Sequence, residues 1–172
     1  MEKRTLVLSY GLIVSGILAR LLPHPANVTP LVAVALFSSA VLPRRVALII
    51  PLAIMMISDW LIGFDPQLPF NWAAFIVVGC VGFLLRDRRS VPRLAGVSLV
   101  SSALFFLISN FGVWAVGRLY PVTAEGLRAC YVAGIPFFRQ MAAGDLFFTA
   151  TCFGLFALAR KRQCSPVIAY SK

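Results

Sequence analysis

The sequence predicts an all-α integral membrane protein with six transmembrane helices and both termini in the cytoplasm. Of its 172 residues 60% are hydrophobic and only 13% are charged, and the mean hydropathy is +0.88. The apolar residues gather in separate runs, and most basic residues lie between these runs. A cytosolic enzyme, a secreted disulfide scaffold and a disordered chain are excluded, because each needs more polar surface, more cysteine or less apolar content.

Six apolar runs are expected to form the helices, since a hydrocarbon core of about 30 Å needs about 20 residues of helix. They are Thr5–Leu22, Leu31–Leu42, Val46–Gly63, Phe70–Leu85, Leu94–Gly117 and Met141–Ala159. At about 1.5 Å per residue the second run reaches only about 18 Å. The preceding stretch, His24–Pro30, is therefore expected to be re-entrant or packed in protein, because bare backbone does not face lipid. All six runs belong to one transmembrane domain, residues 1–172.

The basic residues predict the orientation of these helices. Twelve of the sixteen lie in connections that would share one side of the membrane: Lys3, Arg4, Arg44, Arg45, Arg86, Arg88, Arg89, Arg93, Arg160, Lys161, Arg162 and Lys172. Only Arg20, Arg118, Arg128 and Arg139 remain for the other side. By the positive-inside rule the first group and both termini are cytoplasmic. The net charge of +10 therefore indicates contact with a lipid bilayer and not with nucleic acid.

The connections expected on the outer side are rich in proline and aromatic residues. They are Pro23–Pro30, Phe64–Pro69 and Arg118–Gln140. Aromatic side chains supply stacking area, and proline stiffens the chain that carries them. Such loops on one face only predict a lid over a pocket that opens outward.

Cys80 is the first candidate for chemistry. It lies about nine residues into the fourth run, hence about 13 Å below the outer boundary. Most free cysteines in apolar surroundings are simply small buried hydrophobes. The functional interpretation is a thiolate at the floor of a cavity, suited to a transition metal that arrives with the ligand. The remaining cysteines, Cys130 in an outer loop, Cys152 and Cys164, form no C-x-x-C pair, so a structural zinc site has no support.

Polar residues within or beside the runs are further candidates. His24 is the only histidine, so a multi-histidine metal site is excluded; it either caps the loop or contacts a ligand. Asp59 and Asp145 lie inside runs, where an ionised carboxylate costs about 2.5–3.5 kcal/mol. They are expected to pair with water or Arg139, or to contact a ligand. Asn110 is either a hydrogen-bonding contact between helices or a polar contact in the pocket.

Two other features narrow the function. On the first run Gly11, Ser15 and Ala19 recur every four residues and form a small-residue stripe, against which a helix of the bundle or of a partner protein packs. The chain contains no Walker A loop, no G-x-S-x-G and no H-E-x-x-H, so ATP hydrolysis is excluded.

Five segments carry a resemblance to a known family: Pro23–Pro30, Ser58–Asp59, Asn110–Gly112, Tyr120–Pro121 and Cys130–Asp145. From about Leu6 to Ala159 the chain resembles the S-components of energy-coupling-factor (ECF) vitamin transporters, and more closely the BtuM-type cobalamin (vitamin B12) transporters. The resemblance implies an S-component-like bundle in the bacterial inner membrane that binds and takes up cobalamin. It also implies that the Cys80 thiolate binds the cobalt, with displacement of an axial ligand such as cyanide as an accompanying reaction.

The expected substrate-binding residues are Cys80, His24, Asn27, Asp59, Trp60, Asn110, Tyr120, Tyr131, Arg139 and Asp145. No intrinsic cofactor is expected, since the resemblance implies that cobalamin is the transported ligand. The resemblance implies an ECF-type energising module as a partner. The first helix departs from the family pattern, however, because S-components that dock on a shared module carry alanines four apart where this chain has its small-residue stripe. The protein is therefore expected to act alone.

Three other functions stay open. The first is an S-component-like transporter for a metal-free vitamin or nucleobase precursor, in which Cys80 only packs. The second is a membrane enzyme that modifies a corrinoid or a thiol substrate. The third is a structural assembly protein, which needs no outward cavity. A red colour of the purified protein would favour the cobalamin transporter over all three.

Overall fold

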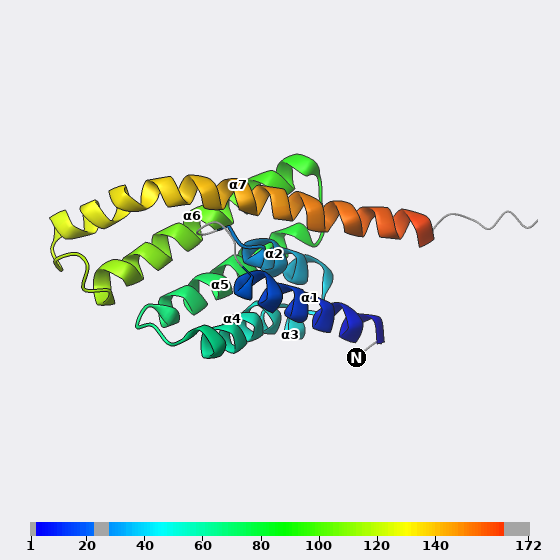
Figure 1. Ribbon diagram of the computed structural model, residues 1–172. Helices are drawn as coiled ribbons and strands as arrows, with labels where there is room; N and C mark the ends of the chain where they lie inside the picture. The colour runs from blue at the N-terminus through cyan, green and yellow to red at the C-terminus, as the bar shows by residue number, and fades with distance from the viewer. Residues whose placement is uncertain (1–2, 23–27, 164–172) are drawn as a thin grey trace, which may run out of the picture.

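The computed structural model describes residues 3–22 and 28–163, and within these ranges the chain is all-α. The helices are α1 (Lys3–Leu21), α2 (Leu31–Val41), α3 (Arg44–Ala47), α4 (Ile49–Ile62), α5 (Leu68–Gly82), the 3-10 turn η1 (Phe83–Leu85), α6 (Val91–Val116) and α7 (Ala124–Gln163). Since α3 leads into α4 and α5 into η1, the described residues form six helical segments (Figure 1). The all-α prediction is confirmed.

Four segments are long and apolar enough to cross a bilayer. They are Arg44–Ile62, Leu68–Leu85, Val91–Val116 and Ala124–Arg160, and Tyr10–Leu21 and Leu31–Val41 are shorter apolar helices. Several long apolar helices in one chain indicate a multi-pass membrane protein. The six crossings and the cytoplasmic termini stay predictions.

The short helix α2 forms the centre of the bundle. Its residues from Leu31 to Ala40 are all buried, as expected for a helix that is apolar on every side. Phe37 packs edge-on against Phe153 and Phe156 of α7, with ring centroids 5.4 Å apart in both pairs. At Gly82 of α5 an added Cβ would lie 2.8 Å from the Cβ of Ser39. The lack of a side chain there lets α5 approach α2 closely.

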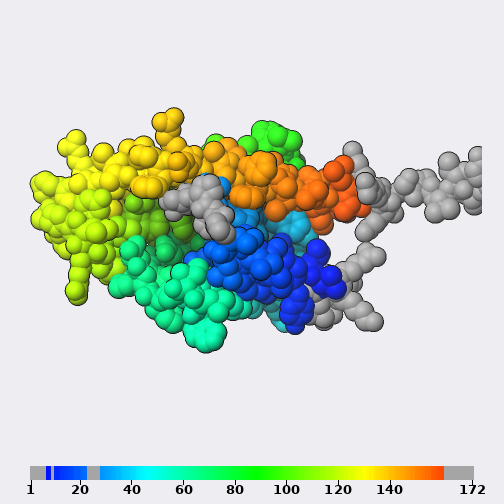
Figure 2. Space-filling model, viewed as in Figure 1, coloured from blue at the N-terminus to red at the C-terminus, as the bar shows by residue number. Residues whose placement is uncertain are grey.

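The first helix, α1, lies on the outside of the bundle (Figure 2). It packs on α4 through Gly16, where an added Cβ would lie 2.6 Å from Cδ1 of Ile54. Gly11 and Ser15 of the small-residue stripe are exposed, and nothing lies within 4 Å of a Cβ added at Gly11. The stripe therefore does not face the bundle, because residues 11 and 15 lie on a different side of the helix from residue 16.

The last helix, α7, begins at Ala124 and not at Met141, so the expected outer loop Arg118–Gln140 is wrong for most of its length. The helix starts where the Oγ1 of Thr123 accepts a hydrogen bond from the Gly126 amide at 3.2 Å, which satisfies one of the unpaired amides of the first turn. Pro136 lies inside the helix and removes one backbone donor there. The packing of α7 along α6 retains the helix in spite of this loss.

The two ends of the bundle differ in charge. Helix α3, the connection between η1 and α6, and the C-terminal part of α7 lie toward one end, on the right in Figure 1. By sequence these segments carry Arg44, Arg45 and Arg160. Arg86 and Arg89 of that connection donate hydrogen bonds to the carbonyls of residues 42 and 40, which end α2. We call the end of the bundle that carries these arginines the basic end. The connection between α6 and α7 lies at the opposite end.

Candidate functional site

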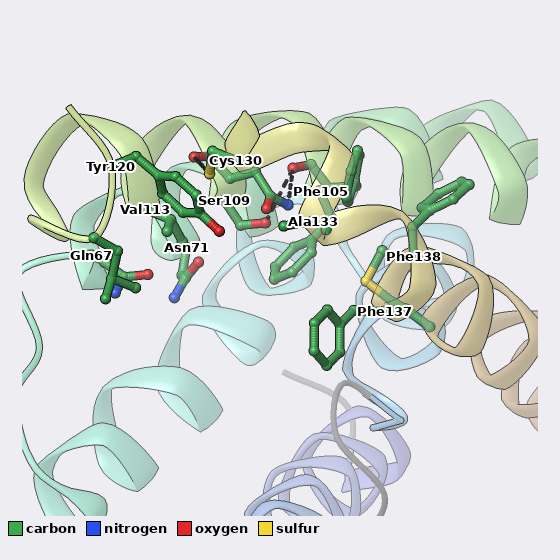
Figure 3. A pocket seen from close by; sticks show the side chains of 15 residues that line it. Gln67, Asn71, Phe105, Ser109, Val113, Tyr120, Cys130, Ala133, Phe137 and Phe138 are labelled. Carbon is green, nitrogen blue, oxygen red and sulfur yellow. Dashed lines mark hydrogen bonds between the residues drawn. The ribbon is translucent and has the colours of Figure 1, made fainter. Parts of the chain in front are cut away.

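A cavity of about 360 Å³ lies between α5, α6 and α7, toward the end opposite the basic end. We call it the outer cavity. Figure 3 shows side chains from the start of α5 across from those of α6 and α7. It is lined by Gln67, Asn71, Phe105, Phe106, Ser109, Asn110, Val113, Leu119, Tyr120, Cys130, Ala133, Gly134, Phe137, Phe138 and Met141. The lining thus combines aromatic rings with amides and hydroxyls.

Close contact between α6 and α7 orders the wall of the outer cavity. The side-chain amide of Asn110 donates to the carbonyl of Phe106 at 2.9 Å, while its backbone carbonyl accepts a bond from the Cys130 thiol at 3.4 Å. At Gly134 an added Cβ would lie 2.7 Å from Oδ1 of Asn110. The ring of Phe106 packs against that of Phe138, with centroids 5.1 Å apart. Asn110 therefore both contacts the neighbouring helix and lines the cavity.

A second cavity of about 250 Å³, the inner cavity, adjoins the first. The two share Asn71, Phe105 and Met141 as lining residues. The rest of the inner cavity is lined by Arg20, Thr29, Leu31, Val32, Met55, Phe75 and Asp145. The aromatic and amide groups of the outer cavity therefore adjoin charged groups that lie nearer the middle of the bundle.

One charged group of the inner cavity is held by a buried network. Nη1 of Arg20 lies 2.7 Å from Oδ1 of Asp59 and donates to the hydroxyl of Ser58 at 2.6 Å. The indole N–H of Trp72 donates to Oδ2 of Asp59 at 2.8 Å. Both oxygens of this carboxylate thus have partners, so Asp59 positions Arg20 at the cavity. The expected partner Arg139 is exposed on α7 instead.

The other charged residue, Asp145, is buried near the middle of α7. The hydroxyl of Ser102 donates to its Oδ2 at 2.6 Å, and Ser98 and Thr149, 3.3 Å apart, extend the polar contacts between α6 and α7. Among the described residues Asp145 has no basic partner within salt-bridge distance. An intramembrane acid that lines a cavity is a candidate contact for a donor group of a ligand.

The structure brings together only part of the site expected from sequence. Asn110 and Tyr120 line the outer cavity, and Asp145 lines the inner one. Trp60 is 72% exposed and lines neither. The hydroxyl of Tyr131 donates to the Leu107 carbonyl at 2.8 Å, so this residue supports α6 from outside the lining. His24 and Asn27 lie outside the described residues.

Cys80 lies away from both cavities. It is exposed on α5, because the helical period turns Phe75, Val78 and Gly82 toward the bundle and leaves residue 80 on the opposite side. Cys130, expected in an outer loop, is instead buried in α7 and lines the outer cavity. The position of Cys130 could not be recognised while its segment was interpreted as a loop.

Sequence reasoning missed Arg20 and Asn71 as lining residues. Arg20 was counted among the basic residues of the outer side, although a basic group at the end of an apolar run and an acid inside another run are a signal for pairing. Asn71 is a polar residue in the first turns of an apolar run, which is the signal that identified Asn110.

The comparisons with known proteins give one match. No curated protein and no solved structure matches the chain. A family described as a family of unknown function, DUF6580, matches residues 1–168. Because this match covers nearly the whole sequence, the chain belongs to the DUF6580 family.

Proposed function

We propose that this protein binds a small organic solute in the adjoining outer and inner cavities and takes it up across the membrane in the manner of an S-component. The observation that carries the proposal is that the outer cavity adjoins an inner cavity lined by Arg20 and Asp145. Cavities of about 300–1,000 Å³ are typical of sites for small ligands. The two adjoining cavities, of about 360 and 250 Å³, together provide a volume in this range.

The lining favours a planar solute with polar edges. The rings of Phe105, Phe106 and Phe137 line the outer cavity and supply aromatic area for contact with a flat solute. The amides of Gln67 and Asn71 each supply both donors and acceptors to the same space. A metal-free vitamin or a nucleobase precursor presents this combination of a flat ring and hydrogen-bonding edges.

Cobalamin, the ligand that the resemblance implies, fits this arrangement less well. Its binding through cobalt requires the Cys80 thiolate at the ligand, whereas Cys80 is exposed and lines neither cavity. A corrin with its side chains is also much bulkier than a single heterocycle. The axial-ligand reaction and the energising module follow from the same resemblance and stay predictions.

The first experiment identifies the solute. The full chain is purified in mild detergent, and small molecules released on denaturation are identified by mass spectrometry. We expect a metal-free heterocycle, no corrinoid colour, and an unchanged corrin absorption spectrum when cyanocobalamin is added. A red protein whose colour disappears in Cys80→Ala would overturn the metal-free assignment in favour of cobalamin.

A second experiment tests the cavity. Ala133 lines the outer cavity, whereas Ala143 is exposed on the same helix and lines none of the described cavities. Ala133→Phe fills the cavity and is expected to weaken binding of the released solute at least about tenfold, or about 1.4 kcal/mol. Ala143→Phe is the matched control and should keep the affinity within about twofold. Equal affinities of the two variants would place the binding site elsewhere.

A further inference from the structure

A groove of about 570 Å³ runs between α6 and α7 as far as the basic end and shares no lining residue with the outer cavity. Its walls are mostly apolar and include Leu94 of α6 and Phe153 of α7. Arg89 and Arg160 also line it. An apolar channel with a cationic end thus lies on the surface of two membrane-spanning helices.

The two arginines contact the same aromatic ring and have no counter-charge among the described residues. Their guanidinium carbons each lie 5.8 Å from the centroid of the same ring, Phe156. Arg89 is also anchored, since Nη2 donates to the Ala40 carbonyl at 2.7 Å and Nε to the Leu85 carbonyl at 3.2 Å. Among the described residues neither arginine has a carboxylate partner.

The electrostatics agree with an unbalanced cluster. Burial, and then the charges of Arg160 and Arg86, hold the pKa of Arg89 below its usual value. The Nε of Arg86 is buried and has no hydrogen-bond partner. A bound anion would lower the repulsion between these cations.

We propose that this groove binds an anionic phospholipid, with an acyl chain along its apolar walls and the phosphate at Arg89 and Arg160. The hydrocarbon part follows from the location of the groove on membrane-spanning helices. The phosphate follows from the two guanidiniums, because arginine forms paired hydrogen bonds with phosphate oxygens. Basic pockets between transmembrane helices at the cytoplasmic side are known to bind anionic head groups.

The test compares two lipids with the same chains and different head groups. The full chain in detergent is titrated with palmitoyl-oleoyl phosphatidylglycerol or with the corresponding phosphatidylcholine, and retained lipid is counted by native mass spectrometry. We expect phosphatidylglycerol to be retained preferentially. Arg160→Gln should weaken this retention about fivefold, the factor that corresponds to about 1 kcal/mol for one basic residue near anionic lipid.

Matched controls separate the site from general charge and from general bulk. Arg128→Gln removes the same charge on an exposed residue of α7 near the opposite end and should leave retention unchanged. Gly154 lines the groove, and nothing lies within 4 Å of a Cβ added there. Gly11 on α1 has the same open space around an added Cβ but does not line the groove. Gly154→Leu should therefore reduce retention by filling the groove, while Gly11→Leu should not.

Two results would overturn the proposal. One is equal retention of both lipids by the wild type. The other is that Arg128→Gln and Gly11→Leu reduce the retention of phosphatidylglycerol as much as Arg160→Gln and Gly154→Leu do. The melting temperatures of all four variants are measured in phosphatidylcholine and are expected to match that of the wild type. A match excludes loss of folding as the reason for lost retention.

Discussion

Arg20 of α1 and Asp59 of α4 form an ion pair at 2.7 Å inside the bundle. The pair joins α1 to a buried residue of α4, and the indole N–H of Trp72 of α5 donates to the second carboxylate oxygen at 2.8 Å. Three helices thus meet at one carboxylate. The same pair presents Arg20 to the inner cavity, so stability and the proposed binding site depend on the same contact.

The first prediction concerns this pair. Arg20→Met leaves the Asp59 carboxylate buried without its cation and is expected to lower the free energy of unfolding by about 3–5 kcal/mol. The double variant Arg20→Met/Asp59→Leu removes both charges and should be less destabilised than Arg20→Met. Denaturation in detergent micelles, followed by circular dichroism, compares Arg20→Met, Asp59→Leu and the double variant with the wild type. Additive losses would show that the two side chains do not interact.

The control for that series is Arg139→Met. Arg139 is exposed on α7 and has no ion pair within the described part of the chain. Its replacement should leave the free energy of unfolding within about 0.5 kcal/mol of the wild type. A large loss would show that Arg139 has a buried partner, as the sequence suggested.

The second prediction tests which face of α1 packs. Gly16→Leu places a side chain where an added Cβ already lies 2.6 Å from Ile54, and overpacking of this kind costs about 1–3 kcal/mol. Gly11→Leu enters open space on the same helix and should not destabilise, because leucine has the higher helix propensity. Thermal unfolding of both variants measures the difference. The reverse order would place the small-residue stripe against the bundle.

The third prediction tests the placement of two cysteines. Cys80 is exposed on α5, whereas Cys130 is buried beside α6. Cys80→Phe should be tolerated, while Cys130→Phe should lower the melting temperature and weaken solute binding, because the ring has no space except the outer cavity. A Cys80→Phe variant as unstable as Cys130→Phe would place Cys80 inside the bundle and revive its role as a cobalt ligand.

The fourth prediction tests the early start of α7. Backbone amides of residues 126–135 should exchange with deuterium much more slowly than those of the connection 117–123, because they are helical. Thr123→Ala removes the acceptor for the Gly126 amide and should lower helix stability by about 0.5–2 kcal/mol, with faster exchange at Gly126. Equal exchange in the two regions would restore the loop that the sequence predicted.

The sequence was a good guide to the helices and a weaker guide to their lengths. Hydrophobic runs locate spans because burial in lipid or protein selects apolar residues over a whole helix. The N-terminal half of α7 was missed because Pro136 and nearby glycines are typical of loops. Its helix is retained by contacts with α6, such as the bond of Cys130 to the Asn110 carbonyl, and no local propensity records such a contact.

The sequence by itself determined that the chain is helical, rich in apolar helices long enough for a membrane, and basic in the connections of one end, since composition and period carry this information directly. It also placed Asn110, Tyr120 and Asp145, which line the two cavities, among the expected substrate-binding residues. Only the tertiary structure decided that Arg20 pairs with Asp59, and that Cys130 rather than Cys80 lines the outer cavity. The physical reason is that packing decides which side of a helix faces its neighbours, and thus whether a side chain points into the bundle or away from it. The neighbouring helix is distant in sequence, so the sequence near the residue does not record this contact.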